Sequence, residues 1–171
     1  MGPIELTIER LARERNTLAR PLEESEIAGL VSSLRHRFLR HEDALDGSPA
    51  SLSELDDLLL GMQDEVASLV RGKHDEKLTA LVREIAAYFG HALLTIPDTE
   101  WRPYDRLRMC SVLVRGQFLA EKDGVVRSFP ATLVPVGNIA ATALDAIAVN
   151  APPLLVHAYK QGLSKVIREA P

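Results

Sequence analysis

The chain has 171 residues, which is the length of one domain or of one domain with an appendage. Hydrophobic residues make up 46% and charged residues 26%, as in an ordinary globular protein, and neither internal repeats nor low-complexity tracts support a solenoid or a fibre. The net charge of −4 gives no general reason to expect nucleic acid as a partner.

Membrane and secretory signals are also missing from the sequence. No apolar run approaches the roughly 18 residues that cross a bilayer, and the N-terminus lacks the apolar segment of a signal peptide. The single cysteine, Cys110, cannot form an internal disulfide, and its place on the apolar side of a predicted strand is typical of a buried thiol. We therefore expect a cytoplasmic protein with no membrane partner.

The front of the chain is predicted to be helical. Apolar residues from Ile4 to Leu22 recur at a roughly heptad spacing, which favours a helix packed on its own domain and leaves self-association through this helix as an alternative. A second helix begins in the acidic residues 23–26 and ends in the basic residues 35–41, which complements the helix dipole. The turn formers Asp46–Pro49 then separate an N-terminal helical segment, residues 1–45, from an α+β domain, residues 51–171.

Two longer helices follow this linker. Ser51 and Glu54 match a capping box at the start of a third helix, which runs to Val70. The fourth helix, residues 75–96, carries the clearest apolar stripe in the chain. Gly90 either caps this helix or lies inside it where another element packs closely. Pro97 then predicts a turn over residues 96–99.

Alternating residues predict the sheet. Residues 110–118 have the period of a half-buried strand, Asp123-Gly124 supplies a hairpin turn, and residues 125–129 form the returning strand. Residues 132–136 are a third strand at an edge, because Pro130 and Pro135 cannot donate to a ladder. Two helices follow, from Asn138 and from about Leu155. The fold class is therefore α+β, with N-terminal helices packed on a small antiparallel sheet of about three strands and C-terminal helices.

Sequence motifs for catalysis or metal binding are absent. The sequence has no HExxH, CxxC, GxSxG, GxGxxG or P-loop motif, and its five histidines lack the spacing of metal ligands, so we expect neither a metal nor a cofactor. An enzyme assembled from distant positions stays open. Its site would lie between the helix of residues 75–96 and the sheet, with Glu84, His91 and Asp105 as the catalytic candidates of a small hydrolase or transferase.

The segment after this helix concentrates residue types that dominate protein-protein hot spots. Trp101, Tyr104, Arg106 and Arg108 are the candidate partner-binding residues, because exposed Trp, Tyr and Arg contribute most to such interfaces. The alternative is that Trp101 fills the gap between the helix and the sheet.

The order of Tyr88-Phe89-Gly90, Trp101, two strands, Phe129-Pro130, a strand and C-terminal helices resembles small uncharacterised bacterial α+β domains over residues 75–168. This resemblance implies a layout and carries no active site. The sequence favours a non-enzymatic intracellular protein that binds a partner protein, of the immunity or accessory-factor type. The alternatives are the hydrolase or transferase above and a self-associating structural or regulatory subunit that uses its N-terminal helix.

Overall fold

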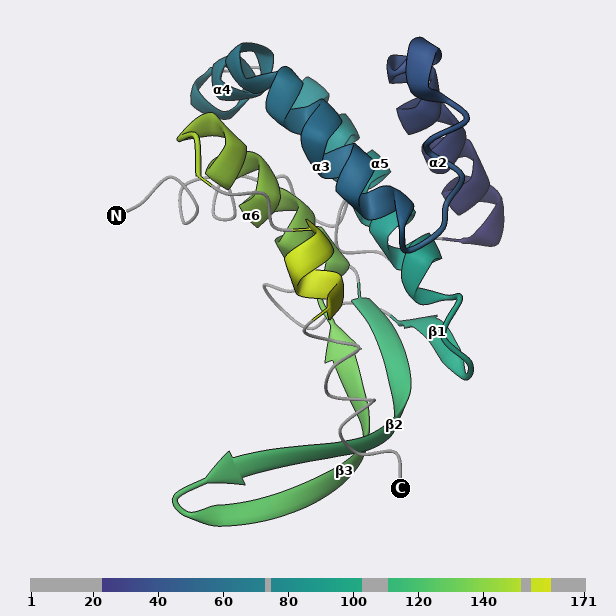
Figure 1. The fold of residues 1–171 in the computed structure, drawn as a ribbon, viewed down its shortest axis with the longest axis vertical. Coiled ribbons are helices and arrows are strands. Elements are labelled where there is room, and N and C mark those ends of the chain that lie inside the picture. The colour runs from purple at the N-terminus through teal and green to yellow at the C-terminus, as the bar shows by residue number, and fades with distance from the viewer. Residues whose placement is uncertain (1–22, 73–74, 103–110, 152–154, 161–171) are drawn as a thin grey trace.

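Helix α5, residues Asp75–Leu93, lies at the centre of a helical layer from which a long hairpin projects (Figure 1). The computed structural model describes residues 23–72, 75–102, 111–151 and 155–160. Its fold is α+β, with helices before and after a three-stranded antiparallel sheet, as the sequence predicts. The elements other than α5 are α2 (Glu24–Arg37), η2 (Leu39–His41), α3 (Ser51–Gly61), α4 (Gln63–Arg71), β1 (Thr99–Arg102), β2 (Ser111–Lys122), β3 (Val125–Val134) and α6 (Val136–Ala148).

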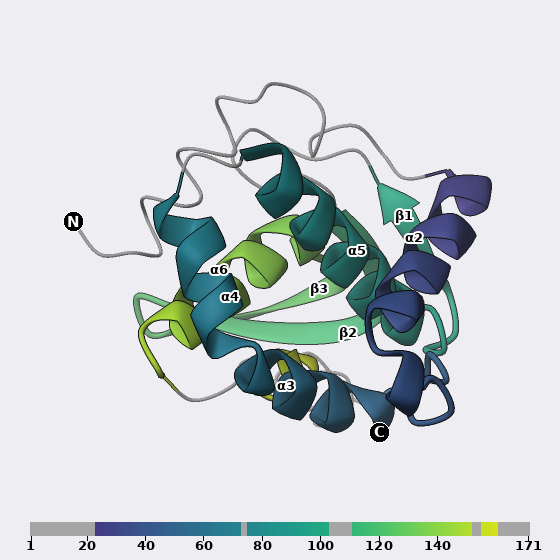
Figure 2. The same ribbon diagram turned by 90° about the horizontal axis from the view of Figure 1, so that it is seen from above.

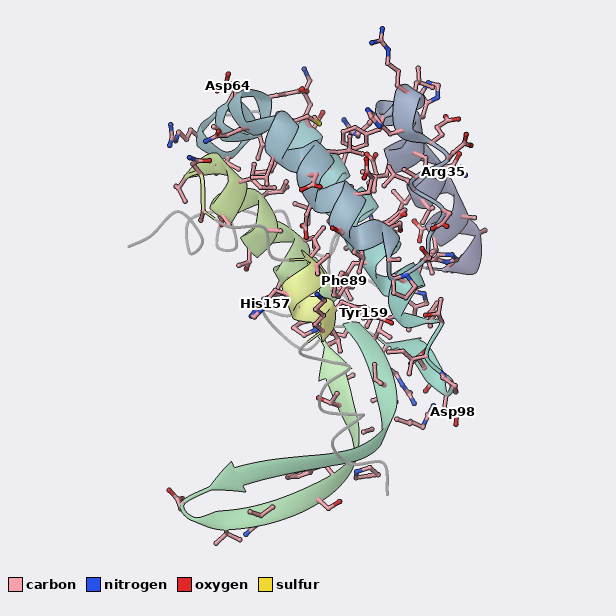
Figure 3. The ribbon with its side chains drawn as sticks, in the orientation of Figure 1. Arg35, Asp64, Phe89, Asp98, His157 and Tyr159 are labelled. Atoms are coloured by element: carbon pink, nitrogen blue, oxygen red, sulfur yellow. The ribbon has the colours of Figure 1, made fainter. Side chains whose placement is uncertain are left out.

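The core forms around α5 because its apolar stripe is covered on several sides. Every residue from 81 to 90 is buried, and α5 packs against α2, α4 and α6. Viewed from above, α2 and α6 flank α5 (Figure 2). Phe89 is fully buried inside this layer (Figure 3). Tertiary burial, more than intrinsic propensity, therefore stabilises this helix.

Gly90 lies inside α5 and allows another element to approach closely. The helix continues through it to Leu93, so it is not the cap. A Cβ built on Gly90 would lie 2.6 Å from Cζ2 and 2.9 Å from Cζ3 of Trp101, and closer still to Cη2. The indole of Trp101 on β1 therefore packs directly on the helix backbone, and it fills the gap between helix and sheet.

The predicted third helix is wrong in its length and in its start. Two helices, α3 and α4, occupy this region, because Met62 departs from helical geometry with φ −100° and ψ 20° directly after Gly61. Ala50 is the N-cap, and Ser51 is already helical. The Ser51 hydroxyl donates to the carbonyl of Ser48 at 2.6 Å and lies 2.5 Å from the Tyr88 hydroxyl, so it joins the loop to α5 and does not form the predicted capping box.

The sheet has three strands, but the third strand is not the predicted one. Its order is β1-β2-β3, and both pairs are antiparallel. Residues 125–134 form one continuous strand, so the separate edge strand predicted at residues 132–136 is wrong. The remaining strand is β1, in a segment predicted as turn and loop, where Trp101 pairs with Val112. Four residues are too few to show a period in the sequence.

The C-terminal part agrees more closely with the prediction. Helix α6 begins two residues before Asn138, and Asn150 at φ 57° follows its end. Residues 155–160 are helical, as predicted, and the carboxylate of Asp56 accepts hydrogen bonds from the backbone N–H groups of Leu155 at 3.2 Å and of Val156 at 3.0 Å. The predicted helix of residues 1–22 and Cys110 lie outside the described residues. Within the described ranges, no helix has both the length and the apolar character needed to cross a membrane.

Candidate functional site

Three of the five exposed large hydrophobic residues in the described ranges lie on the far half of the β2–β3 hairpin. Residues 118–129, which we call the arm, extend beyond the helical layer (Figure 1). Three large hydrophobic residues on β3 are exposed to solvent: Val125 at 52%, Val126 at 60% and Phe129 at 45%. Successive strand residues point to opposite faces, so the arm presents apolar side chains on both faces. Exposed apolar groups of this kind make the arm a candidate interaction surface.

A β-bulge bends the hairpin where the arm begins. The register shifts between Arg115 and Phe118, so that Gly116 and Gln117 together lie opposite Pro130. Such a bulge bends its strand and increases the local twist, which directs the arm away from the body. The two-residue turn at the tip is the predicted Asp-Gly turn, with φ 54° at Asp123 and 75° at Gly124.

Pro130 also removes a backbone hydrogen-bond donor from the unpaired edge of β3. In a two-residue hairpin the flanking residues, Lys122 and Val125, bond to one another across the strands. Every second residue after Val125 then directs its amide toward β2, and the residues between them direct theirs outward. Pro130 stands at an outward position, where it offers no donor to an added strand. The exposed side chains of β3, more than its backbone edge, are therefore suited to contact a partner.

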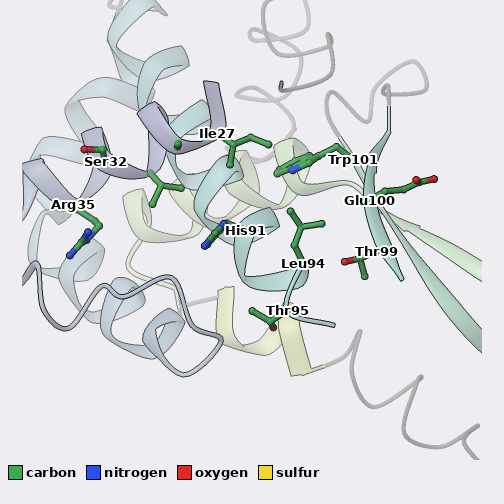
Figure 4. A pocket seen from close by; sticks show the side chains of 11 residues that line it. Ile27, Ser32, Arg35, His91, Leu94, Thr95, Thr99, Glu100 and Trp101 are labelled. Carbon is green, nitrogen blue, oxygen red and sulfur yellow. The ribbon is translucent and has the colours of Figure 1, made fainter. Parts of the chain in front are cut away.

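The second surface feature is a groove of about 720 Å³ between α2, α5 and β1 (Figure 4). Apolar side chains dominate its walls: Ile27 and Val31 come from α2, Leu94 follows α5, and Trp101 comes from β1. The groove also takes in Ala28, Ser32, Arg35, His91, Thr95, Thr99 and Glu100. Its size is that of a typical protein binding pocket.

Charge is distributed unevenly along the groove. Arg35 lies at one end and Glu100 at the other (Figure 4). Arg35 donates from Nη2 to the carbonyl of Glu42 at 3.0 Å. Glu100 accepts a hydrogen bond from Arg115 at 2.8 Å and is also paired with Arg102; the bond to Arg115 is the largest cause that holds its pKa below the usual range. The two ends of the groove therefore differ in the charge of the nearest lining residue.

His91 is exposed on α5, yet its ring is held in place from one side. A Cβ built on Gly47 would lie 2.9 Å from Cδ2 of His91, so the imidazole packs against the backbone of the loop before α3. Gly47 itself has φ +82°, a conformation that other residues rarely adopt. The backbone N–H of Gly47 donates to the hydroxyl of Tyr88 at 3.0 Å, which attaches the same loop to α5.

Glu84 belongs to a different part of α5 and has a structural partner. Both of its carboxylate oxygens accept hydrogen bonds from Arg37 on α2, each at 2.7 Å. The Glu84 side chain is only 6% exposed, whereas that of Arg37 is 34% exposed. The bidentate bond to Glu84 is the main cause of the raised pKa of Arg37. This pair joins α2 to α5.

The structure places the predicted site residues in three groups. His91 and Trp101 both line the groove, whereas Glu84 does not. Asp105, Tyr104, Arg106 and Arg108 lie outside the described residues. Among the described residues, no group of three or more His, Cys, Asp or Glu side chains could hold a metal ion.

Sequence patterns do not reveal the two surfaces. They predict the hairpin but not its exposure, because the apolar residues at 125, 126 and 129 are equally consistent with a strand buried on one face. Consecutive apolar residues at 118–120 and at 125–126 are the signal in the sequence of apolar groups on both faces. Comparisons with protein-family models, with curated proteins and with solved structures find no match for this chain.

Proposed function

We propose that this protein is a non-enzymatic intracellular interaction protein of the immunity or accessory-factor type, and that it binds a partner protein through the arm. The observation that supports this proposal is the solvent exposure of Val125, Val126 and Phe129 on a hairpin that bends away from the helical layer. Each of these side chains is about half exposed, so covering it would contribute about half of the free energy of full burial, or about 0.8–1.5 kcal/mol for each one. A partner that covers them would recover this free energy.

The residue chemistry of the described parts agrees with a binding role. Glu84, one of the catalytic candidates, has both oxygens occupied by Arg37, and His91 faces a mostly apolar groove. Between them there is no pair of groups placed for acid-base exchange. A contact surface made of two valines and a phenylalanine needs no such pair, because its free energy comes from apolar burial.

The test is affinity capture with a matched control. Wild-type protein, the double variant Val126→Asp, Phe129→Asp and the variant Leu39→Asp are immobilised and exposed to lysate of the source cells. Leu39 is the natural control because it is also a large exposed hydrophobic residue, at 62%, and it lies on η2 away from the arm. Each captured protein is then purified and titrated against all three forms by calorimetry.

We expect wild type and Leu39→Asp to bind the same partner with equal affinity, and the arm variant to bind at least tenfold more weakly. Equal affinity for all three forms would remove the arm from the interaction. Turnover of a small molecule by the pure protein, unaffected by the arm variant, would contradict the non-enzymatic function.

A further inference from the structure

The arm and the groove have complementary properties, and one chain carries both. The arm presents exposed apolar side chains that no described element covers, and the groove presents apolar walls with about 720 Å³ of unfilled space. We propose that the arm of one copy of this chain fills the groove of a second copy, so that two chains exchange arms. This inference rests on the proposed function, because it names the partner that the arm contacts.

The size and polarity of the groove fit the arm tip. Protein pockets of about 300–1,000 Å³ accept groups the size of several side chains. Ile27, Val31, Leu94 and Trp101 provide the aliphatic and aromatic contacts that Val125, Val126 and Phe129 lack in a single chain. Ala28 is the smallest side chain on the α2 wall and leaves room for a strand to approach the helix.

Length and charge agree with a lengthwise fit. The α2 wall runs from Ile27 to Arg35, eight residue steps along the helix or about 12 Å. The exposed residues of β3 from Val125 to Phe129 span four residue steps of a strand, or about 13 Å. When the turn points toward Arg35, Asp123 approaches that guanidinium. The carboxylate of Asp123 then faces the opposite charge of Arg35.

The proline in β3 favours this insertion over the direct pairing of two β3 edges. Two β3 edges that paired directly would need a continuous row of outward donors, and Pro130 interrupts that row. Insertion into the groove uses side chains on both faces of the arm and leaves the edge free. A reciprocal exchange also closes after two chains, whereas a one-way contact would continue into open chains.

The experiment measures association of the purified full chain by sedimentation velocity over a range of concentrations. The arm variant is Phe129→Asp, with Phe129→Leu as its conservative counterpart. The groove variant is Ala28→Arg, which puts a long side chain into the groove from an exposed helical position. Its control is Gly29→Arg, because Gly29 is also exposed on α2, does not line the groove and has no neighbouring atom within 4 Å of its Cβ position.

We expect wild type, Phe129→Leu and Gly29→Arg to form the same dimer. Phe129→Asp and Ala28→Arg should each weaken it at least tenfold. A mixture of Phe129→Asp with Ala28→Arg should associate more strongly than either alone, because the intact arm of the second variant meets the intact groove of the first. Emission of Trp101, the only tryptophan, should shift to longer wavelength as the dimer is diluted, because the groove then fills with water.

Three results would overturn the arm exchange. A dimer that Ala28→Arg leaves unchanged would place the arm against some other surface, including a second arm. A mixture of the two variants that associates no better than its components would separate the arm from the groove. A chain that stays monomeric at all concentrations would refute self-association. If the arm of this monomer still binds a different captured protein, the proposed function stands. If the arm binds no protein, the arm exchange and the proposed function both fail.

Discussion

Replacing Gly90 with alanine tests the packing that joins helix α5 to the sheet. Alanine is favoured over glycine inside a helix by about 1 kcal/mol, so in open space the substitution would stabilise the protein. Here the new Cβ would lie 2.6 Å from Cζ2 and 2.9 Å from Cζ3 of Trp101, well inside the 3.4–4 Å of ordinary contact. Because the indole is rigid, the whole ring must retreat from α5, and β1 must move with it or release it.

Overpacking of this kind costs about 1–3 kcal/mol, and three ring atoms at such short distances put the cost in the upper half of that range. After the helix gain is subtracted, Gly90→Ala should lower the free energy of unfolding by about 1–2 kcal/mol. Gly29→Ala is the matched control. It lies inside α2 with no atom within 4 Å of its Cβ position, and it should raise the free energy of unfolding by about 0.5–1 kcal/mol.

The assay is urea unfolding followed by far-ultraviolet circular dichroism and by the fluorescence of Trp101, the only tryptophan in the chain. The native emission of Gly90→Ala should also differ from that of wild type, whereas that of Gly29→Ala should not. Adding Trp101→Leu should reduce the cost of Gly90→Ala, because the clashing ring is gone. If Gly90→Ala stabilises the protein as much as Gly29→Ala does, the indole does not pack on Gly90 and the reasoning fails.

Three further substitutions test other contacts of the core. Arg37→Ala should lower the free energy of unfolding by about 1–3 kcal/mol, because it leaves the buried carboxylate of Glu84 unpaired; this range is reduced for the partial exposure of Arg37. Adding Glu84→Gln to the same chain should restore part of the lost stability. If urea melts show no recovery in this double variant, the account of the pair is contradicted. Burial raises the pKa of the Asp56 carboxyl above 3.8, despite the two backbone amides that lower it. The folded protein therefore binds the proton of Asp56 more tightly than the unfolded chain does. The contribution of this proton to stability is complete below pH 3.8 and is lost as the pH rises through the folded pKa. Asp56→Asn should therefore flatten this part of the curve of stability against pH, and parallel curves for the two proteins would rule out the raised pKa. Tyr88→Phe removes the acceptor of the Gly47 amide and should cost about 1–3 kcal/mol, with faster hydrogen exchange at Gly47; unchanged exchange would show that this bond does not hold the loop.

The amino-acid sequence by itself is sufficient for features that depend on local periodicity and on turn chemistry. The stripe of α5 predicts the helix, because apolar residues spaced by three and four have the period of a helix, whereas the burial of every residue from 81 to 90 depends on the elements that surround it. Asp123-Gly124 predicts the hairpin turn, because both residues tolerate positive φ. These local elements are enough to predict the α+β class and the antiparallel sheet, and both predictions are confirmed.

Features that depend on distant residues are not encoded in this way. The break at Met62 interrupts a continuous apolar pattern, and β1 becomes a strand only because β2 pairs with it and Trp101 packs on Gly90. The groove exists because α2 stands beside α5 and β1, which no spacing within α2 encodes. The arm is exposed because a bulge at Gly116 and Gln117 bends the hairpin away from the helices, whereas its sequence specifies only that it is a hairpin. The periodicity of apolar residues indicates which face of a helix or strand is apolar. Tertiary packing determines which element buries that face and which apolar residues remain exposed to solvent.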